Sequence, residues 1–258
     1  ASSGIGKSTA KLLSNKGFRV YGTGRNPNIN ENIGYSLIPL DVTKSETISL
    51  AIDLILEKEG RLDVLVNNAG MGITGPIEDT PTNEMRKVFE TNFFGAIDMM
   101  KAVLPQMRKQ QSGTIINVTS IAGYMGLPYR GVYSATKGAL DLVSEAARME
   151  VKEFGVNIVT IAPGDVATNI AAGRYHTPVF DNSAYKEKYQ MNLDLMDSHV
   201  DSGMNPIKMA EKIHQIVNLK QPIVHYKVGA FMEKFSIVLK KILPSKIYEK
   251  LLMNHYKL

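Results

Sequence analysis

Short apolar runs alternate with longer stretches of helical periodicity along most of the chain. The apolar runs predict strands at Phe18–Gly22, Tyr35–Leu40, Leu62–Val66, Thr114–Thr119 and Asn157–Ala162, with Ile223–Val224 as a short edge strand. The periodic stretches predict helices at Ser45–Glu59, Asn83–Gln110 and Tyr133–Phe154. Continuous apolar strands separated by helices are typical of a parallel sheet that is covered on both faces.

The helical pattern at the start of the chain has no strand before it. In a doubly wound sheet the strand before the first helix is central. We therefore expect the native polypeptide to extend upstream of Ala1 by about ten residues, with a strand of about 5–6 residues that ends in glycine. With that strand, the pattern predicts a single doubly wound, Rossmann-type α/β domain over residues 1–258. Its mostly parallel sheet of seven strands would have helices on both faces, which gives three layers in the order αβα.

The composition is that of a globular domain and excludes several kinds of site. The 258 residues are 44% hydrophobic and 21% charged, which is ordinary for a globular domain. No apolar stretch approaches the roughly 20 residues of a membrane-spanning helix. The absence of cysteine excludes disulfides, thiolate metal sites and a cysteine nucleophile, and leaves a cytoplasmic location as the default.

The net charge of +5 is concentrated at one end of the chain. Residues Lys227–Leu258 contain seven lysines and two glutamates, so the rest of the chain is neutral overall. A nucleic-acid-binding protein usually spreads basic residues over a docking face. This distribution therefore argues against a nucleic-acid partner.

The opening sequence ASSGIGKSTA is compatible with two kinds of phosphate-binding loop. Gly6-Lys7-Ser8 matches the end of a triphosphate-binding P-loop, and Gly4-Ile5-Gly6 matches part of a dinucleotide-binding turn. The P-loop requires glycine where Ala1 stands. It also requires an acid after a later strand to hold Mg²⁺, but Leu62–Val66 continues as Asn67-Asn68. These two departures favour the dinucleotide turn.

Several motifs together resemble the short-chain dehydrogenase/reductase family. They are Ala1-Ser-Ser-Gly-Ile-Gly6, Asp41-Val42, Asn67-Asn-Ala-Gly70, Asn92, Ser120, Tyr133-Ser-Ala-Thr-Lys137 and Pro163-Gly164, in the family's order and spacing over residues 1 to about 170. The family's leading Thr-Gly would precede Ala1. The resemblance implies a Rossmann-type oxidoreductase that interconverts a ketone or aldehyde and its alcohol.

Tyr133 and Lys137 are four residues apart in a predicted helix, which places them on one face. A neighbouring ammonium favours the phenolate and lowers the pKa of a tyrosine from its usual value of about 10. The pair therefore suits acid–base work at a carbonyl oxygen, although a Tyr–Lys pair alone could be an ordinary surface contact. Ser120 follows a strand at the sheet edge where ligands bind and could hydrogen-bond the same oxygen.

The resemblance adds roles to these catalytic candidates. It selects Ser120 over Thr119 through the spacing to Tyr133, and makes Ser120 and Tyr133 the residues that contact the substrate. It implies that Asn92 completes a catalytic set by holding a water that links Lys137 to solvent. For Asn92, a helix-kinking or backbone-bonding role is the compatible alternative.

The choice of cofactor depends on the residue that follows the Phe18–Gly22 run. NAD-binding sites usually place Asp or Glu there for the ribose 2′-hydroxyl, whereas this chain has Arg25 and no acid. A guanidinium can pair with a 2′-phosphate, so we expect NADP rather than NAD; a solvated surface arginine is the alternative. The resemblance implies a cofactor site made of Ser2, Ser3, Gly4, Ile5, Gly6, Arg25, Asp41, Val42, Asn68, Ala69, Gly70, Tyr133, Lys137, Pro163, Gly164, Val166 and Thr168.

Two later segments lack the strand–helix rhythm. Residues 173–206 mix aromatic and methionine side chains with polar ones, and by the resemblance they are a substrate lid that suggests a bulky apolar substrate; a helical pair with its own small core is the alternative. Residues 228–258 form a basic amphipathic extension. Such an extension could cover the substrate cleft, contact another subunit or lie on a membrane, and we rank membrane contact last.

The remaining expectations concern assembly, metals and the kind of activity. Helices near Gly95–Gln110 and Tyr133–Phe154 resemble those through which family members form homodimers or homotetramers. The five histidines show no ligand spacing, so we expect no metal site. Within the family, the Asn67–Gly72 and Arg25 regions and the apolar tail resemble those of hydroxysteroid and retinol dehydrogenases. The alternative to an enzyme is a non-catalytic NADP-binding sensor or scaffold on the same fold.

Overall fold

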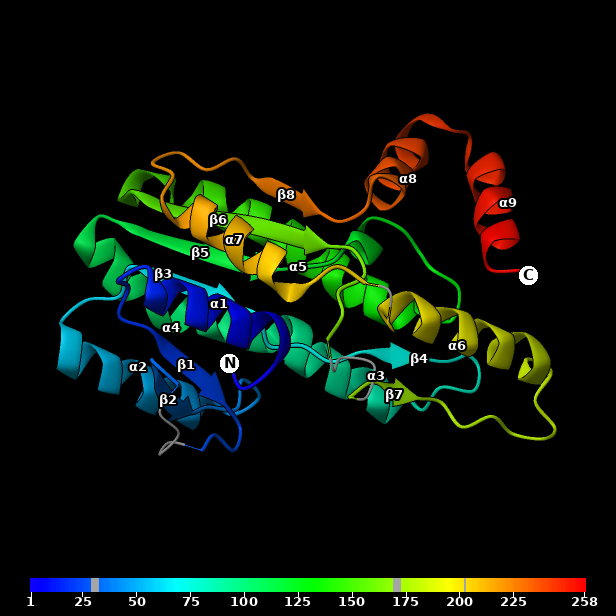
Figure 1. The fold of residues 1–258 in the computed structure, drawn as a ribbon, viewed down its shortest axis with the longest axis horizontal. Coiled ribbons are helices and arrows are strands. Elements are labelled where there is room, and N and C mark those ends of the chain that lie inside the picture. Colours follow the sequence, from blue (N-terminus) through cyan, green and yellow to red (C-terminus); the bar gives the residue numbers. More distant parts are fainter. Residues whose placement is uncertain (29–32, 169–172, 202) are drawn as a thin grey trace.

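A four-stranded parallel sheet forms the centre of the computed structural model, which describes residues 1–28, 33–168, 173–201 and 203–258. The strands lie in the order β3-β5-β6-β8 (Figure 1). Their bounds are β3 (Val64–Asn67), β5 (Gly113–Val118), β6 (Val156–Pro163) and β8 (His225–Val228). The middle of the sheet is inaccessible to water, because β5 and β6 are buried on both faces.

Two further strand pairs lie outside this sheet. β1 (Tyr21–Gly24) pairs in parallel with β2 (Ser36–Pro39), and β4 (Ile73–Thr74) pairs with β7 (Tyr175–His176). Among the described residues, β1 does not pair with β3. The predicted fold class is confirmed. The prediction of one seven-stranded sheet is wrong for the residues that the structure describes, because their main sheet contains four strands.

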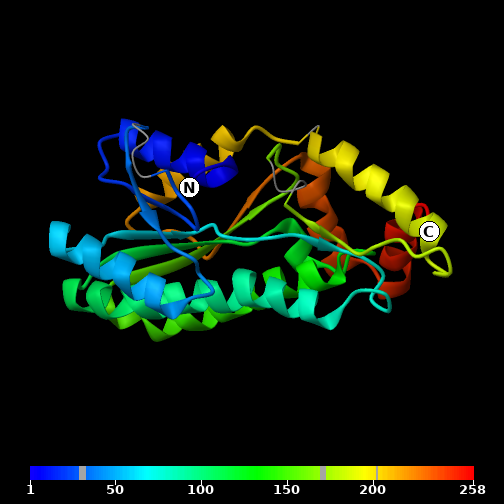
Figure 2. The same ribbon diagram turned by 90° about the horizontal axis from the view of Figure 1, so that it is seen from below.

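Helices cover both faces of the main sheet (Figure 2). α1 and α7 lie on one face, and α2, α4 and α5 lie on the other. The helices are α1 (Gly4–Asn15), α2 (Ser45–Glu59), α3 (Thr82–Phe89), α4 (Gly95–Gln110), α5 (Gly131–Glu150), α6 (Lys186–Asp201), α7 (Pro206–Val217), α8 (Phe231–Ile242) and α9 (Ser245–His255).

Each face of the sheet has its own apolar core. On one face, Met209, Ile213 and Ile216 of α7 pack on β5 and β6. On the other, the methionines and Val103 of α4 pack between α2 and the sheet. The buried apolar area provides most of the driving force for folding, and it holds the carboxyl ends of β3, β5 and β6 in fixed positions.

The observed element boundaries depart from the sequence pattern at three places. The apolar residues Phe18–Val20 precede β1, and Ile223–Val224 precede β8, which begins at His225. The helix predicted over Asn83–Gln110 is divided by a π-helical turn at Glu90–Phe94. Such turns insert one extra residue in the helix and are frequent at functional sites.

The two patternless segments have different structures. The segment 173–206, apart from residue 202, which lies outside the described residues, contains β7 and the single helix α6, so the helical-pair alternative is wrong. The C-terminal extension forms α8 and α9, which lie beyond the carboxyl ends of β6 and β8 (Figure 1). In the part of the chain that the structure describes, no helix has the length and apolar character needed to cross a bilayer.

Candidate active site

The opening loop forms a tight cradle at the start of α1. Gly4 has φ +54°, a left-handed conformation that favours glycine. A Cβ atom on Gly4 would lie 3.2 Å from Thr168 Cγ2, and one on Gly6 would lie 3.0 Å from Asn68 Nδ2. The glycines therefore let the loop approach the segments that follow β3 and β6. This cradle at a helix N-terminus fits a dinucleotide pyrophosphate, with Ser2, Ser3 and Ile5 completing the loop.

Arg25 and Asp41 lie at the ends of β1 and β2. Arg25 is exposed, directly after β1. The Asp41 carboxylate accepts hydrogen bonds from the Thr43 backbone N–H (3.0 Å) and hydroxyl (2.8 Å). The hydrogen bonds from Thr43 lower the pKa of Asp41, and the charge of Arg25 adds to this effect. Val42 lies against Gly95, where a Cβ atom would approach Val42 Cγ2 to 2.7 Å.

Asn92 is fully buried in the π-helical turn and binds the loop that follows β3. Its Oδ1 accepts from the Met71 backbone N–H (2.8 Å), and its Nδ2 donates to the Met71 carbonyl (2.9 Å) and to Thr136 Oγ1 (3.1 Å). The Asn92 side chain thus joins this loop, which includes Asn68 and Ala69, to α5. A Cβ atom on Gly70 would lie 3.3 Å from Asn92 Oδ1, so glycine is needed for this approach.

Lys137 lies one helical turn after Tyr133 and is buried beneath the site. Its Nζ donates a 2.9 Å hydrogen bond to the Val118 carbonyl and lies 6.0 Å from the centre of the Tyr133 ring. Burial lowers the pKa of Lys137 to about 8, because removing the ammonium from water disfavours its charged form.

The structure corrects the expected protonation of Tyr133. Burial raises the pKa of Tyr133 above its ordinary value, and the lowering effects of Arg130, a hydrogen bond with Ser120 and Arg174 only partly offset it. The Arg130 guanidinium carbon lies 5.8 Å from the centre of the Tyr133 ring. Arg130 and Arg174, rather than Lys137, are therefore the cations that favour the phenolate in this structure. A raised pKa keeps Tyr133 protonated near neutral pH.

Ser120 is placed by the end of β5. It is buried, and its Oγ accepts a hydrogen bond from the Ala122 backbone N–H (3.2 Å) at the start of a 3-10 turn over Ile121–Tyr124. The same side chain hydrogen-bonds Tyr133. The end of β5 and the first turn of α5 thus bring the two predicted substrate-contacting groups together.

Ser120 and Tyr133 open into one large cavity of about 1090 Å³. Pro163, Gly164, Val166 and Thr168, the predicted cofactor segment after β6, also line it, together with Ile5 of the opening loop. Side chains from residues 173–206 and from α8 and α9 also line it, among them Met196, Met204, Met232, Leu239, Leu251 and Leu252. The C-terminal extension therefore contributes to the lining of the cavity.

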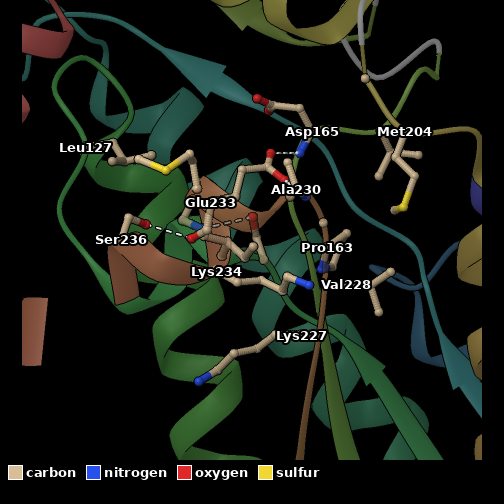
Figure 3. Close-up of a pocket in the computed structure, with 18 of the residues that line it drawn as sticks. Leu127, Pro163, Asp165, Met204, Lys227, Val228, Ala230, Glu233, Lys234 and Ser236 are labelled. Atoms are coloured by element: carbon tan, nitrogen blue, oxygen red, sulfur yellow. Dashed lines mark hydrogen bonds between the residues drawn. The ribbon is translucent and has the colours of Figure 1, made fainter. Parts of the chain in front are cut away.

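Glu233 of α8 fastens this wall to the segment after β6. Its carboxylate accepts hydrogen bonds from the backbone N–H groups of Asp165 (2.7 Å) and Ala230 (2.6 Å), and Figure 3 shows it pointing at Asp165. The Gly164 N–H donates to the Val228 carbonyl (2.8 Å). A Cβ atom on Gly164 would lie 2.1 Å from the Glu233 carboxylate, so glycine is required at this position.

Four groups that shape this site had no clear signal in the sequence. Arg130 could have been noticed, because it lies three residues before Tyr133. Arg174 belongs to a segment without pattern. Glu233 lies three residues after Ala230, which is not a typical helix-capping residue. Met71 takes part only through its backbone, which side-chain identity does not predict.

A second polar cluster lies between α5 and β8, and its histidine and two acidic residues are not among those that line the cavity. His225 Nδ1 lies 3.5 Å from Asp141 Oδ1, and His225 Nε2 lies 3.0 Å from Glu145 Oε1. These three side chains are spaced as metal ligands could be, which the sequence did not predict for any histidine. Thr160 Oγ1 also contacts His225 Nδ1 (2.8 Å). Each ring nitrogen therefore already has a protein partner.

Comparisons with known proteins agree on one family. The model of the family described as "short chain dehydrogenase" matches residues 1–178. A 3-ketodihydrosphingosine reductase from Bacteroides thetaiotaomicron is 40% identical over 99% of this chain and 95% of its own length. The crystal structure of a short-chain dehydrogenase from Streptomyces avermitilis is 31% identical and has a TM-score of 0.82, covering 97% of this chain and 94% of that one. The structure of ElxO with NADP bound is 28% identical, with a TM-score of 0.73 over 88% of this chain and 93% of ElxO. These similarities exclude the P-loop interpretation of the opening sequence.

Proposed function

The chain belongs to the short-chain dehydrogenase/reductase family, and we propose that it uses NADPH to reduce a ketone carried on a long apolar chain. Membership makes it an oxidoreductase of carbonyl and CH–OH groups with a nicotinamide cofactor. The finer assignments of NADP, substrate and residue roles are our proposal.

The shape and lining of the cavity carry the proposal about the substrate. The lining of the cavity of about 1090 Å³ includes Ser120 and Tyr133 together with apolar side chains of α8 and α9. Beyond the part that the proposed cofactor segment lines, an alkyl chain would bury apolar area against the side chains of α8 and α9. The name of the Bacteroides relative refers to a long-chain ketone, so 3-ketodihydrosphingosine is the first substrate to test.

The cofactor site consists of the opening loop, Arg25, the Asp41-Val42 pair, Asn68–Gly70 and the segment from Pro163 to Thr168. The bound nicotinamide supplies the hydride. Ser120 hydrogen-bonds the carbonyl oxygen of the substrate and steadies the charge that develops there. Tyr133, which its raised pKa keeps protonated at neutral pH, donates its proton to that oxygen.

Lys137 and Asn92 support this proton transfer from behind the cavity. We assign Lys137 to the cofactor ribose and to the return of a proton to Tyr133. Its pKa of about 8 lets it exchange protons near neutral pH. Asn92 fixes the loop after β3 against α5 and, as in the family, would hold a water that links Lys137 to solvent.

The preference for NADPH is expected to depend on Arg25. Arg25 is exposed at the end of β1 with no acid beside it in sequence, which suits a 2′-phosphate. Arg25→Asp should weaken NADPH binding by about 10- to 100-fold, the size of one charge-assisted pair, and leave NADH binding little changed. Fluorescence titration with both cofactors measures this, with Arg61→Asp as a control for a distant exposed arginine. A wild-type preference for NADH would contradict the assignment.

The reductase activity itself is tested by NADPH oxidation with ketones of increasing chain length. We expect kcat/KM to rise with chain length, with 3-ketodihydrosphingosine among the best substrates. Steroid ketones, retinal and quinones complete the panel. NADPH binding without turnover of any carbonyl would favour the sensor or scaffold alternative.

The outer face of α5 supports a homo-oligomer. Leu142 and Met149, seven residues apart on this helix, are 68% and 72% exposed, which is costly for large apolar side chains. We propose that α5 contributes these residues to a subunit interface that also includes α4. Sedimentation equilibrium at micromolar concentration should give a dimer or tetramer, and Leu142→Lys should shift it toward the monomer. A monomeric wild type would refute the interface.

A further inference from the structure

The outward face of α8 is apolar. Phe231, Phe235, Val238 and Ile242 are exposed and follow one another at intervals of four, three and four residues, which places them in a single stripe along the helix. Phe231 and Ile242, at its two ends, are 72% and 68% exposed. The rings of Phe231 and Phe235 stack 5.6 Å apart. We call these four residues the α8 stripe.

The opposite face of α8 packs against the body of the protein. Ile237 is buried, and Glu233 is bound to the backbone of Asp165. A surface helix normally turns its apolar face to the core. The stripe is therefore additional apolar surface, directed away from the molecule at the end where α8 and α9 project (Figure 1).

α9 carries further exposed apolar residues. Ile247 and Leu251 are exposed one helical turn apart. Lysines border the apolar residues on both helices, among them Lys241 on α8 and Lys246 and Lys250 on α9. The segment that contains these helices holds the whole net charge of the chain. Apolar side chains bordered by lysines match a surface that has an apolar interior and negatively charged groups above it.

We propose that α8 and α9 dock on a lipid surface that carries anionic headgroups. The stripe enters the boundary between headgroups and acyl chains, while the bordering lysines bind the headgroups. Met232 and Leu251 are exposed, and both also line the cavity that contains Ser120 and Tyr133. The docked surface is thus continuous with the cavity wall, and a lipid ketone can pass between the two without crossing water.

A second copy of the chain is the competing occupant of the stripe. A two-fold contact brings the same patch of both subunits together, so the lysine-rich segments of both copies would face each other. Their like charges repel. Each of the same lysines, when it is near an anionic bilayer, instead increases the affinity for that bilayer about fivefold. The charge therefore favours lipid over a second copy.

Vesicle sedimentation tests the proposal. The full chain is mixed with vesicles of phosphatidylcholine alone or with about 30% phosphatidylglycerol, at about 0.1 M salt. We expect binding to the anionic vesicles and release as salt is raised, because screening weakens the contribution of the lysines. No ketone is needed in this assay, so its outcome does not depend on the proposed reductase function.

Two variants separate the apolar and the charged contributions. Phe231→Ser with Phe235→Ser should reduce binding to anionic vesicles at least tenfold, since burial of the two rings is lost. Lys241→Glu with Lys250→Glu should reduce it by about 20-fold or more. The matched controls are Leu50→Ser with Leu219→Ser, and Lys58→Glu with Lys109→Glu, which change exposed residues elsewhere and should bind as wild type does. Circular dichroism and the thermal midpoint confirm that each variant folds.

Three results would overturn the proposal. The first is no binding of the wild type to the anionic vesicles. The second is unchanged binding of the folded stripe variant. The third is a lower mass of the stripe variant by light scattering with no vesicle binding by either protein, which would assign the stripe to a second copy of the chain.

Discussion

Tyr133→Phe is expected to lower turnover in the reduction of the best ketone by about 10² or more, the usual size of general-acid catalysis. The substitution removes the proton that Tyr133 donates and changes little volume. NADPH should therefore still bind with an affinity close to that of the wild type. Steady-state kinetics and a fluorescence titration measure the two quantities separately.

The pH profile gives an independent check on Tyr133. Burial raises its pKa above the ordinary value of a phenol, so Tyr133 is protonated at neutral pH and loses its proton only in strongly alkaline solution. Alcohol oxidation requires the phenolate, and its rate should therefore still be rising above pH of about 10. That rise should be absent in Tyr133→Phe. Tyr21→Phe, which removes a phenol bound to the distant Glu59, is the control, and near-normal turnover by Tyr133→Phe would refute the catalytic role.

Lys137→Met should impair both catalysis and cofactor binding. The substitution keeps an unbranched side chain but removes the ammonium that donates to the Val118 carbonyl. We expect turnover to fall by about 10² and NADPH affinity to fall as well, because the same group serves the proton path and the ribose. Lys101→Met, on the exposed side of α4, is the control and should change neither quantity.

The pH dependence of reduction distinguishes Lys137 from Tyr133. Burial lowers the pKa of Lys137 to about 8, so the ammonium is present below that pH and is lost above it. Reduction by the wild type should therefore decline above pH of about 8, well before Tyr133 ionises. The decline should be missing in Lys137→Met. A wild-type profile that stays flat from pH 7 to about 10 would contradict this account of Lys137.

The sequence by itself determined the layered α/β fold and the composition of the candidate site. Strands buried on both faces are mostly apolar, so β3, β5 and β6 are evident as predominantly apolar runs. Motifs such as Tyr133-Ser-Ala-Thr-Lys137 are local, because one helix carries both functional side chains. Their order and spacing were enough to indicate the family that the comparisons confirm.

The tertiary structure decided what depends on contacts between distant segments. The pKa of Tyr133 depends on how deeply the phenol is buried and on Arg130 and Arg174 around it, and a helical Tyr–Lys spacing alone gave the wrong direction. The His225 cluster exists only because β8 lies beside α5. The sign of a pKa shift does not follow from local sequence, because it depends on how far the folded chain excludes water from the group. A contact between α5 and β8 does not follow from it either, because the two segments are far apart in the sequence.

The placement of the C-terminal segment was decided in the same way. Its sequence shows a basic amphipathic stretch, which could cover a cleft, meet a subunit or lie on a lipid surface. The contact between Glu233 and the Asp165 backbone fixes which side of α8 faces the cavity. It also leaves Phe231, Phe235, Val238 and Ile242 facing outward. Helical periodicity gives the angular separation of two faces, but only the packing of the helix determines which of them meets the protein.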